Sequence, residues 1–231
     1  EIHALYTPAQ KVSGDFYDII PLEEGCTGVA IADVSGKGVP ASLLMAICHT
    51  SLRHYAQAHE SPSAVLRAMN AEMSAEMRKD MFITLIYAVI NEKKSTITLA
   101  RAGHELPLVL QKGPSGDYLT TAIDSEGMAL GMVPCEIFDE VIEDKTIPFG
   151  QGETLLLYTD GVTETTNFDD EEYSARRLQN LFKSLREESP ERINQEIFES
   201  LEQFKGDNHL QDDITLVSVR YKPTVSNNEQ T

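Results

Sequence analysis

Residues 81–121 read MFITLIYAVINEKKSTITLARAGHELPLVLQKGPSGDYLTT, and this stretch predicts four strands in succession. Met81 to Ile90 and Thr96 to Ala100 form one expected hairpin, and Pro107 to Gln111 and Asp117 to Thr121 form a second. Strands that follow one another without an intervening helix pair antiparallel. The stretch therefore favours an antiparallel sheet over a doubly wound α/β fold.

Helical periodicity appears on both sides of this strand region. We expect one helix pair before it, at Val39–His59 and Ser63–Arg78, and a second pair after it, at Ser174–Glu187 and Pro190–Lys205. Further strands are expected at Tyr17–Leu22, Gly28–Val34, Phe138–Ile147, Thr154–Thr159 and Ile214–Arg220. The order predicts an α+β fold, an antiparallel β-sandwich flanked by helix pairs in four layers (α-β-β-α).

The domain is expected to span residues 1–221, followed by a polar, disordered tail at 222–231. The stripe of Met69, Met73 and Met77 on the second helix is interpreted as core. Because the sequence begins with Glu1 rather than methionine, we expect it to be a piece of a longer protein.

The chain of 231 residues carries a net charge of -18, with 41% hydrophobic residues. Such acidity argues against nucleic acid and against direct contact with an anionic membrane, because both require basic surfaces. It leaves two interpretations open. The carboxylates either keep the protein in solution or are partly clustered to bind cations.

The three cysteines, Cys26, Cys48 and Cys135, are widely spaced and include no CxxC pair. This usage argues against a disulfide framework or a zinc site and favours a reducing compartment. Cys48 is expected to pack as a small apolar side chain. With no signal peptide or apolar run of membrane-spanning length in the sequence, we predict a cytoplasmic location.

Aspartates recur at the ends of apolar strands or in the turns beside them. The positions are Asp15 and Asp18, Asp33, Asp160, and Asp212 and Asp213. A carboxylate at the end of a buried strand is costly unless it is paired with a cation. The nearest basic residues in the sequence are only Lys11 and Lys37, so divalent cations are a plausible substitute for salt bridges.

Ligands made only of oxygen favour Mg²⁺, Mn²⁺ or Ca²⁺ over zinc or copper. Two such ions can share a water molecule, lower its pKa and direct it at phosphorus without a nucleophilic side chain. Each motif taken alone has a simpler explanation, since Asp-Gly is a common turn and Asp-Asp can be a solvated strand edge. Only the four sites together indicate a metal centre.

Five motifs resemble those of the PPM (protein phosphatase 2C-like) family, and in particular its bacterial SpoIIE/RsbU-type branch. The motifs are SGDFYD at 13–18, ADVSGKGVPAS at 32–42, AGH at 102–104, YTDGVTE at 158–164 and QDDIT at 211–215. The resemblance runs from about Tyr6 to Tyr221. It implies a β-sandwich flanked by helix pairs and a protein-serine/threonine phosphatase that depends on two Mn²⁺ or Mg²⁺ ions.

The resemblance also implies roles for single residues. Asp15 would bind one metal ion, Asp33 would bridge both ions, and the carbonyl of Val34 would be a further ligand. Asp160 and Asp212 would hold the other ion, which makes these four aspartates the catalytic set through metal-activated water. Asp18 and Asp213 are candidates for positions behind the direct ligands, and Asp213 stands where many relatives have asparagine.

Two departures from the family pattern affect phosphate binding and proton transfer. The arginine that grips phosphate in eukaryotic relatives has no counterpart in residues 8–12, where Lys11 is either a substitute point charge or a solvated lysine. The histidine proposed as general acid in those relatives is replaced by Ser35. His104 suits a structural hydrogen bond better than catalysis, and Gly36 and Gly38 are explained by a tight turn without a P-loop pattern.

The family branch implies a signalling function in stress responses, with a phosphoprotein substrate such as an anti-sigma-factor antagonist. It also implies an upstream sensor or regulatory domain that acts through the helices at 39–59 and 63–78, and a homodimer is compatible with it. Two alternatives to an active phosphatase remain open from the sequence, a catalytically silent or weakly active interaction module with the same fold and a Ca²⁺- or Mg²⁺-stabilised binding domain.

Overall fold

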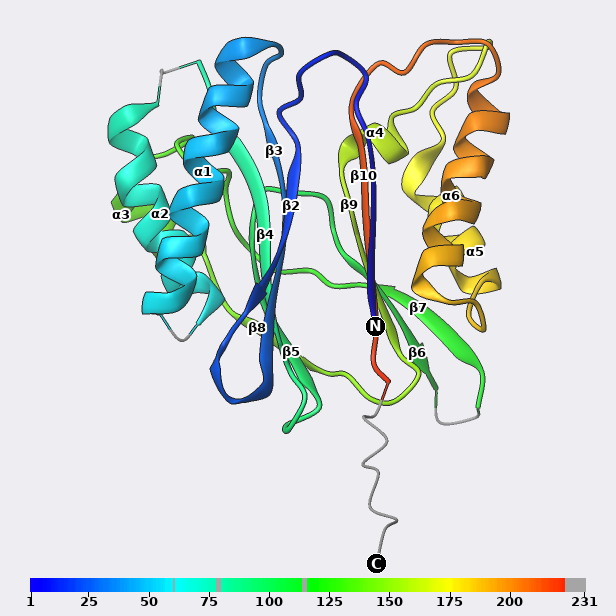
Figure 1. The fold of residues 1–231 in the computed structure, drawn as a ribbon, viewed down its shortest axis with the longest axis horizontal. Helices are drawn as coiled ribbons and strands as arrows, with labels where there is room; N and C mark the ends of the chain where they lie inside the picture. Colours follow the sequence, from blue (N-terminus) through cyan, green and yellow to red (C-terminus); the bar gives the residue numbers. More distant parts are fainter. Residues whose placement is uncertain (60, 78–79, 114–115, 223–231) are drawn as a thin grey trace, which may run out of the picture.

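The computed structural model describes residues 1–59, 61–77, 80–113 and 116–222, which form two five-stranded antiparallel sheets (Figure 1). One sheet has the order β1 (Ile2–Thr7), β10 (Ile214–Arg220), β9 (Thr154–Tyr158), β6 (Leu108–Lys112) and β7 (Tyr118–Ala122). The other has the order β2 (Phe16–Pro21), β3 (Cys26–Val34), β4 (Ile83–Asn91), β5 (Thr96–Ala102) and β8 (Lys145–Pro148).

Helices cover the outer face of each sheet, as Figure 1 shows. The β2–β3–β4–β5–β8 sheet is covered by α1 (Val39–Ala58), α2 (Pro62–Glu76) and α3 (Cys135–Val141). The other sheet is covered by α5 (Ser174–Ser184) and α6 (Pro190–Lys205), and two short helical turns are η1 (Glu23–Gly25) and α4 (Asp160–Thr163). The predicted α-β-β-α sandwich is confirmed.

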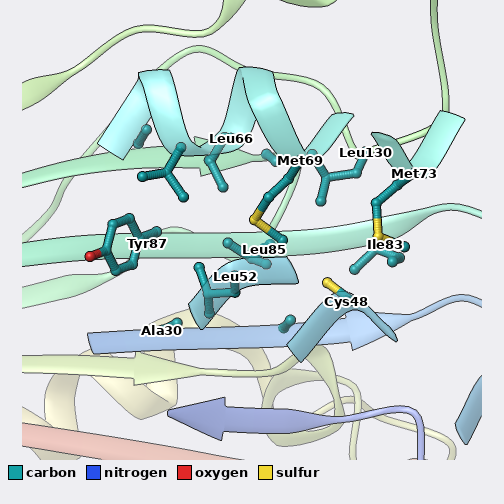
Figure 2. Packing of buried hydrophobic residues seen from close by; sticks show 14 of the residues in the cluster. Ala30, Cys48, Leu52, Leu66, Met69, Met73, Ile83, Leu85, Tyr87 and Leu130 are labelled. Carbon is teal, nitrogen blue, oxygen red and sulfur yellow. The ribbon is translucent and has the colours of Figure 1, made fainter. Parts of the chain in front are cut away.

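Three apolar clusters hold these layers together, because each sheet buries both of its faces. One lies between the helices α1–α3 and their sheet, one lies between the two sheets, and one lies beneath α5 and α6. Figure 2 shows Met69 and Met73 reaching from α2 toward the sheet, near the buried Cys48 of α1. The interpretations of the methionines and of Cys48 as core residues are therefore confirmed.

The predicted strand at Phe138–Ile147 is wrong. Its first part is the helix α3, which is preceded by Pro134, and only Lys145–Pro148 forms a strand. In α3 Phe138 is buried against the helix-side cluster while Ile137 is exposed, which is the one-sided burial of a surface helix. A single large apolar residue with scattered neighbours does not distinguish a short helix from a strand.

Three further elements were not predicted, the edge strand β1 and the short helices η1 and α4. The tail predicted to be disordered begins at Lys222, and its remaining residues, 223–231, lie outside the described part of the chain, as does Arg78 at the expected end of the second helix. A separate finding concerns membranes. In the described ranges, no helix combines the length and apolar character needed to cross a membrane.

Candidate metal centre

Four aspartates that are far apart in the chain lie at one end of the β-sandwich. Asp15 directly precedes β2, Asp33 is the penultimate residue of β3, Asp160 begins α4 after β9, and Asp212 lies just before β10. Antiparallel pairing sets the start of β2 beside the end of β3, and the start of β10 beside the end of β9. The strand ends that carry the aspartates thus meet at the upper end of the sandwich in Figure 1.

These carboxylates are close enough to change one another's ionisation. Burial, followed by the charge of Asp33, raises the pKa of Asp15 to about 9. Burial and then the charge of Asp160 raise the pKa of Asp33 to about 7, and Asp212 and Asp213 add to this against a hydrogen bond with Asp15. Burial and the charge of Asp212 also raise the pKa of Asp160. Negative charge is therefore unfavourable here in the protein alone.

Protein cations offset only part of this charge, through Lys37, which acts against the raised pKa of Asp160. Among the residues that the structure describes, Asp15, Asp33 and Asp160 make no ion pair, whereas Asp212 pairs with Lys37. Neighbouring glutamates add to the acidity, since the pKa values of Glu105 and Glu164 are raised by burial and then by the charge of Asp160. A group of buried and half-buried carboxylates, most of which lack a counter-ion among the described residues, fits hard divalent cations.

The four aspartates lie near one another but do not form a ready-made cation site. Within the described ranges, no three His, Cys, Asp or Glu side chains stand close enough together to form a complete cation site.

Hydroxyl groups fix two of the aspartates in place. The Thr215 hydroxyl donates to Asp15 Oδ2 at 2.6 Å, and the Ser13 hydroxyl donates to Asp213 Oδ2 at 2.5 Å. The backbone N–H of Ala9 donates to Asp213 Oδ1 at 2.7 Å, so both oxygens of Asp213 are engaged. Asp213 thus fastens the loop before β2 to the start of β10.

Two glycines allow the backbone to close around the cluster. A Cβ atom on Gly161 would lie 2.1 Å from the carbonyl oxygen of Asp213, so the chain after Asp160 packs directly on the start of β10. A Cβ atom on Gly14 would lie 2.8 Å from the carbonyl oxygen of Val34. The Val34 carbonyl, predicted as a ligand from the resemblance, therefore faces the loop that carries Asp15.

Asp18 does not point into the cluster. It shares the face of β2 that carries Phe16 and Ile20 into the helix-side core, and it pairs with α1 instead. Its carboxylate accepts two hydrogen bonds of 2.6 Å from Arg53 and one contact of 2.9 Å with His49. Burial opposes ionisation, but these bonds outweigh it and lower the pKa of Asp18.

Asp18→Asn should therefore lower stability without weakening metal binding. The amide of asparagine cannot accept both hydrogen bonds that Arg53 donates to the buried carboxylate, and we expect a loss of about 1–3 kcal/mol in the free energy of unfolding. Urea denaturation and calorimetric titration with Mn²⁺ measure the two quantities. The exposed Asp139, changed to asparagine, is the control. A large fall in Mn²⁺ affinity at unchanged stability would show that Asp18 supports the metal ligands after all.

The remaining candidates from the sequence are His104, Ser35 and Lys11, and none of them is placed as a catalytic group. His104 is 4% exposed, its Nδ1 lies 2.8 Å from the Thr84 hydroxyl, and burial lowers its pKa to about 4. The Ser35 hydroxyl accepts a hydrogen bond of 2.8 Å from the backbone N–H of Phe82. Lys11 is exposed and forms no ion pair with a described residue. His104 and Ser35 thus support the fold around Asp33 and its strand.

Sequence reasoning missed the groups that position the aspartates. Ser13, Thr215 and Lys37 all lie within the motifs, but none was assigned a contact with a particular carboxylate. Glu105, whose pKa reflects Asp160, directly follows the AGH motif. Their place inside motifs was the available signal, whereas their partners lie as far as 200 residues away.

Comparisons with known proteins agree with the fold and with the motif set. A model of the family described as Stage II sporulation protein E (SpoIIE) matches residues 23–222. Phosphoserine phosphatase RsbU of Bacillus subtilis (strain 168) is 31% identical over 225 residues, which cover 96% of this chain and 63% of RsbU. The chain thus spans less than two thirds of that relative.

Solved structures share the fold at lower sequence identity. The SiaA-PP2C domain of Pseudomonas aeruginosa matches with a TM-score of 0.80 and 20% identity, covering 96% of this chain and 86% of that domain. RsbX in complex with magnesium matches with a TM-score of 0.63 and 19% identity, covering 94% of this chain and 92% of RsbX.

Proposed function

Because this chain belongs to the SpoIIE family of PP2C-like serine/threonine phosphatases, we propose that Asp15, Asp33, Asp160 and Asp212 bind the divalent cations on which its phosphatase activity depends. The observation that carries the proposal is the gathering of one buried and three half-buried carboxylates at one end of the sandwich, three of which make no ion pair with a described residue.

Asp33 is the best candidate for a ligand shared by two cations. Its ionisation responds to Asp15, Asp160, Asp212 and Asp213, so it occupies the middle of the cluster. Asp15 lies on one side with its hydroxyl partner Thr215, and Asp160 and Asp212 affect each other on the other side. This arrangement supports one cation near Asp15 and the Val34 carbonyl, and a second near Asp160 and Asp212.

Bound Mg²⁺ or Mn²⁺ ions would supply a water of lowered pKa and neutralise the charge of the phosphate. The residues of the chain would hold the carboxylates in position for those ions, through the hydroxyls of Ser13 and Thr215. We assign protonation of the leaving group to water. The Ser35 hydroxyl already accepts a backbone hydrogen bond, and the lowered pKa of His104 keeps its ring neutral near pH 7.

The finer features of the function belong to the same proposal. We propose two Mn²⁺ or Mg²⁺ ions, a phosphorylated anti-sigma-factor antagonist as substrate, and control by an upstream domain through α1 and α2. The magnesium complex of RsbX and the greater length of RsbU support the metal and the added domain. The three free cysteines agree with action in the cytoplasm, and a homodimer is compatible with such control.

The test is hydrolysis of a phosphoserine peptide by the purified chain. We expect phosphate release with Mn²⁺ or Mg²⁺ and a fall to the background rate after EDTA, because the carboxylates alone provide no activated nucleophile. A phosphothreonine peptide should behave in the same way. Hydrolysis that persists in EDTA and after dialysis against chelator would refute the proposed metal dependence.

A further inference from the structure

A shallow pocket opens beside the carboxylate cluster, and Lys37 lies at its wall. The pocket is lined by Ala9, Gln10, Val12, Gly14, Asp33, Gly36, Lys37, Asp212 and Asp213. Lys37 is the one basic side chain in this lining, among the residues that the structure describes. Its ammonium group is therefore the protein cation closest to the expected metal ligands.

Lys37 is held by two oxygen atoms next to β10. Its Nζ lies 3.1 Å from Asp212 Oδ2 and 2.7 Å from the backbone carbonyl oxygen of Gln211. The side chains of Lys37 and Asp212 remain 51% and 44% exposed, respectively. Exposed ion pairs of this kind contribute little stability, so the contact is easily exchanged.

Lys37 lies in a turn between two glycines whose backbone conformations favour glycine. Gly36 and Gly38 have φ values of +91° and +80°, which are backbone conformations that favour glycine. A Cβ atom on either glycine would meet no atom within 4 Å. Nothing packs on this loop at the two glycines, and the four-carbon stem of Lys37 is free to turn toward the pocket mouth.

We propose that Lys37 changes partners during the reaction cycle and is a phosphate-positioning residue. This inference rests on the proposed function. In the metal-free protein the Lys37 ammonium neutralises Asp212. When Asp212 binds a divalent cation, the ammonium is released and pairs with the phosphate of the substrate.

The acidity of the chain explains why a positive side chain is needed beside the substrate. The protein has a net charge of -18, and its pocket is lined by three aspartates, so a phosphate dianion is repelled until positive charge is present. An ammonium group at the pocket wall supplies such charge and a hydrogen-bond donor. Lys11, the other candidate from the sequence, is exposed in the neighbouring loop and is absent from the pocket lining.

The first part of the proposal is tested without turnover, by calorimetric titration of the metal-free protein with Mn²⁺. Lys37→Gln removes the competing cation, and we expect Mn²⁺ to bind roughly two- to fivefold more tightly, the range that corresponds to an exposed ion pair. Lys37→Arg keeps the charge, and Lys11→Gln removes an equal charge from the neighbouring loop. Both controls should stay within about twofold of the wild type.

The second part is tested with inorganic phosphate as the probe of the Mn²⁺-loaded protein. We expect Lys37→Gln to bind phosphate about tenfold more weakly and to raise KM for the phosphoserine peptide more than it lowers kcat. Lys37→Arg should recover most of the phosphate affinity, while Lys11→Gln should match the wild type.

Either of two results would overturn the exchange. Equal Mn²⁺ affinity in the wild type and Lys37→Gln would show that Lys37 does not compete for Asp212. Equal phosphate affinity in the two Mn²⁺-loaded proteins would show that Lys37 does not reach the substrate. If the wild type binds Mn²⁺ and phosphate but hydrolyses no phosphopeptide, the proposed function fails separately, because both titrations still report on Lys37.

Discussion

Asp33→Asn is expected to lower kcat/KM for a phosphoserine peptide by at least about a thousandfold, through the loss of metal-dependent water activation. Asp33 lies in the middle of the cluster, where four other aspartates affect its ionisation. Steady-state phosphate release at saturating Mn²⁺ measures the loss.

The same substitution should stabilise the metal-free protein. Burial and nearby charge raise the pKa of Asp33 from 3.8 to about 7, so at pH 8 the folded protein carries an unfavourable charge that asparagine lacks. We expect the free energy of unfolding in EDTA to rise by about 1–4 kcal/mol at pH 8. Lower activity together with higher stability indicates a metal ligand, because substitution of a residue with a merely structural role would lower both the activity and the stability of the protein.

The exposed Asp139 of α3, changed to asparagine, is the matched control and should leave activity and stability close to the wild type. An Asp33→Asn protein that keeps activity within about tenfold of the wild type at saturating Mn²⁺ would contradict a shared ligand at this position.

The second large effect is a loss of stability of the metal-free protein as pH rises. The folded-state pKa values of Asp15 and Asp33, about 9 and about 7, lie above the ordinary value of 3.8. Between pH 4 and these values the folded state binds protons that the unfolded state has released. The stabilising contribution is therefore complete below about pH 4 and is lost as pH rises, by up to about 1.4 kcal/mol per pH unit for each such carboxyl.

Divalent cations should reverse this loss, because they replace the missing protons. At a free concentration one hundred times the dissociation constant, each bound ion adds about 2.7 kcal/mol to the free energy of unfolding. The gain should increase with pH, since the ligands must be deprotonated to bind. Urea denaturation at pH 6, 7, 8 and 9, in EDTA and in Mn²⁺, measures both effects.

The Asp33→Asn protein serves as the control for this series, because it should show a flatter pH dependence in EDTA and a smaller gain from Mn²⁺. A wild-type protein whose stability in EDTA does not change between pH 6 and 9 would contradict the raised pKa values. A lack of stabilisation by Mn²⁺ at pH 8 would contradict cation binding at the cluster.

The succession of strands and helices could be predicted because it depends on local patterns. β10 was predicted with the observed bounds, and the continuous apolar run of β3 marked a strand buried on both faces. The edge strand β1 was missed, since its place depends on pairing with β10 more than 200 residues later. The helix α3 was missed because its seven residues bury only Phe138.

In the candidate site, too, the sequence predicts what depends on neighbouring residues and not the contacts between distant segments. Each aspartate could be located at a strand end from its own neighbours in the sequence. The partners of Asp15, Asp212 and Asp213 could not, because Thr215, Lys37 and Ser13 come from distant segments. Asp18 was grouped with Asp15 because they share a motif, although alternation along a strand separates positions three residues apart.

The most direct test of the metal centre is an anomalous difference map from a crystal of this chain grown in saturating Mn²⁺. We predict two peaks roughly 3.5–4 Å apart. Asp33 should contact both, Asp15 should contact one, Asp160 and Asp212 should contact the other, and the Lys37 ammonium should have left Asp212. A map with manganese bound only elsewhere, or with none between these four carboxylates, would contradict the account.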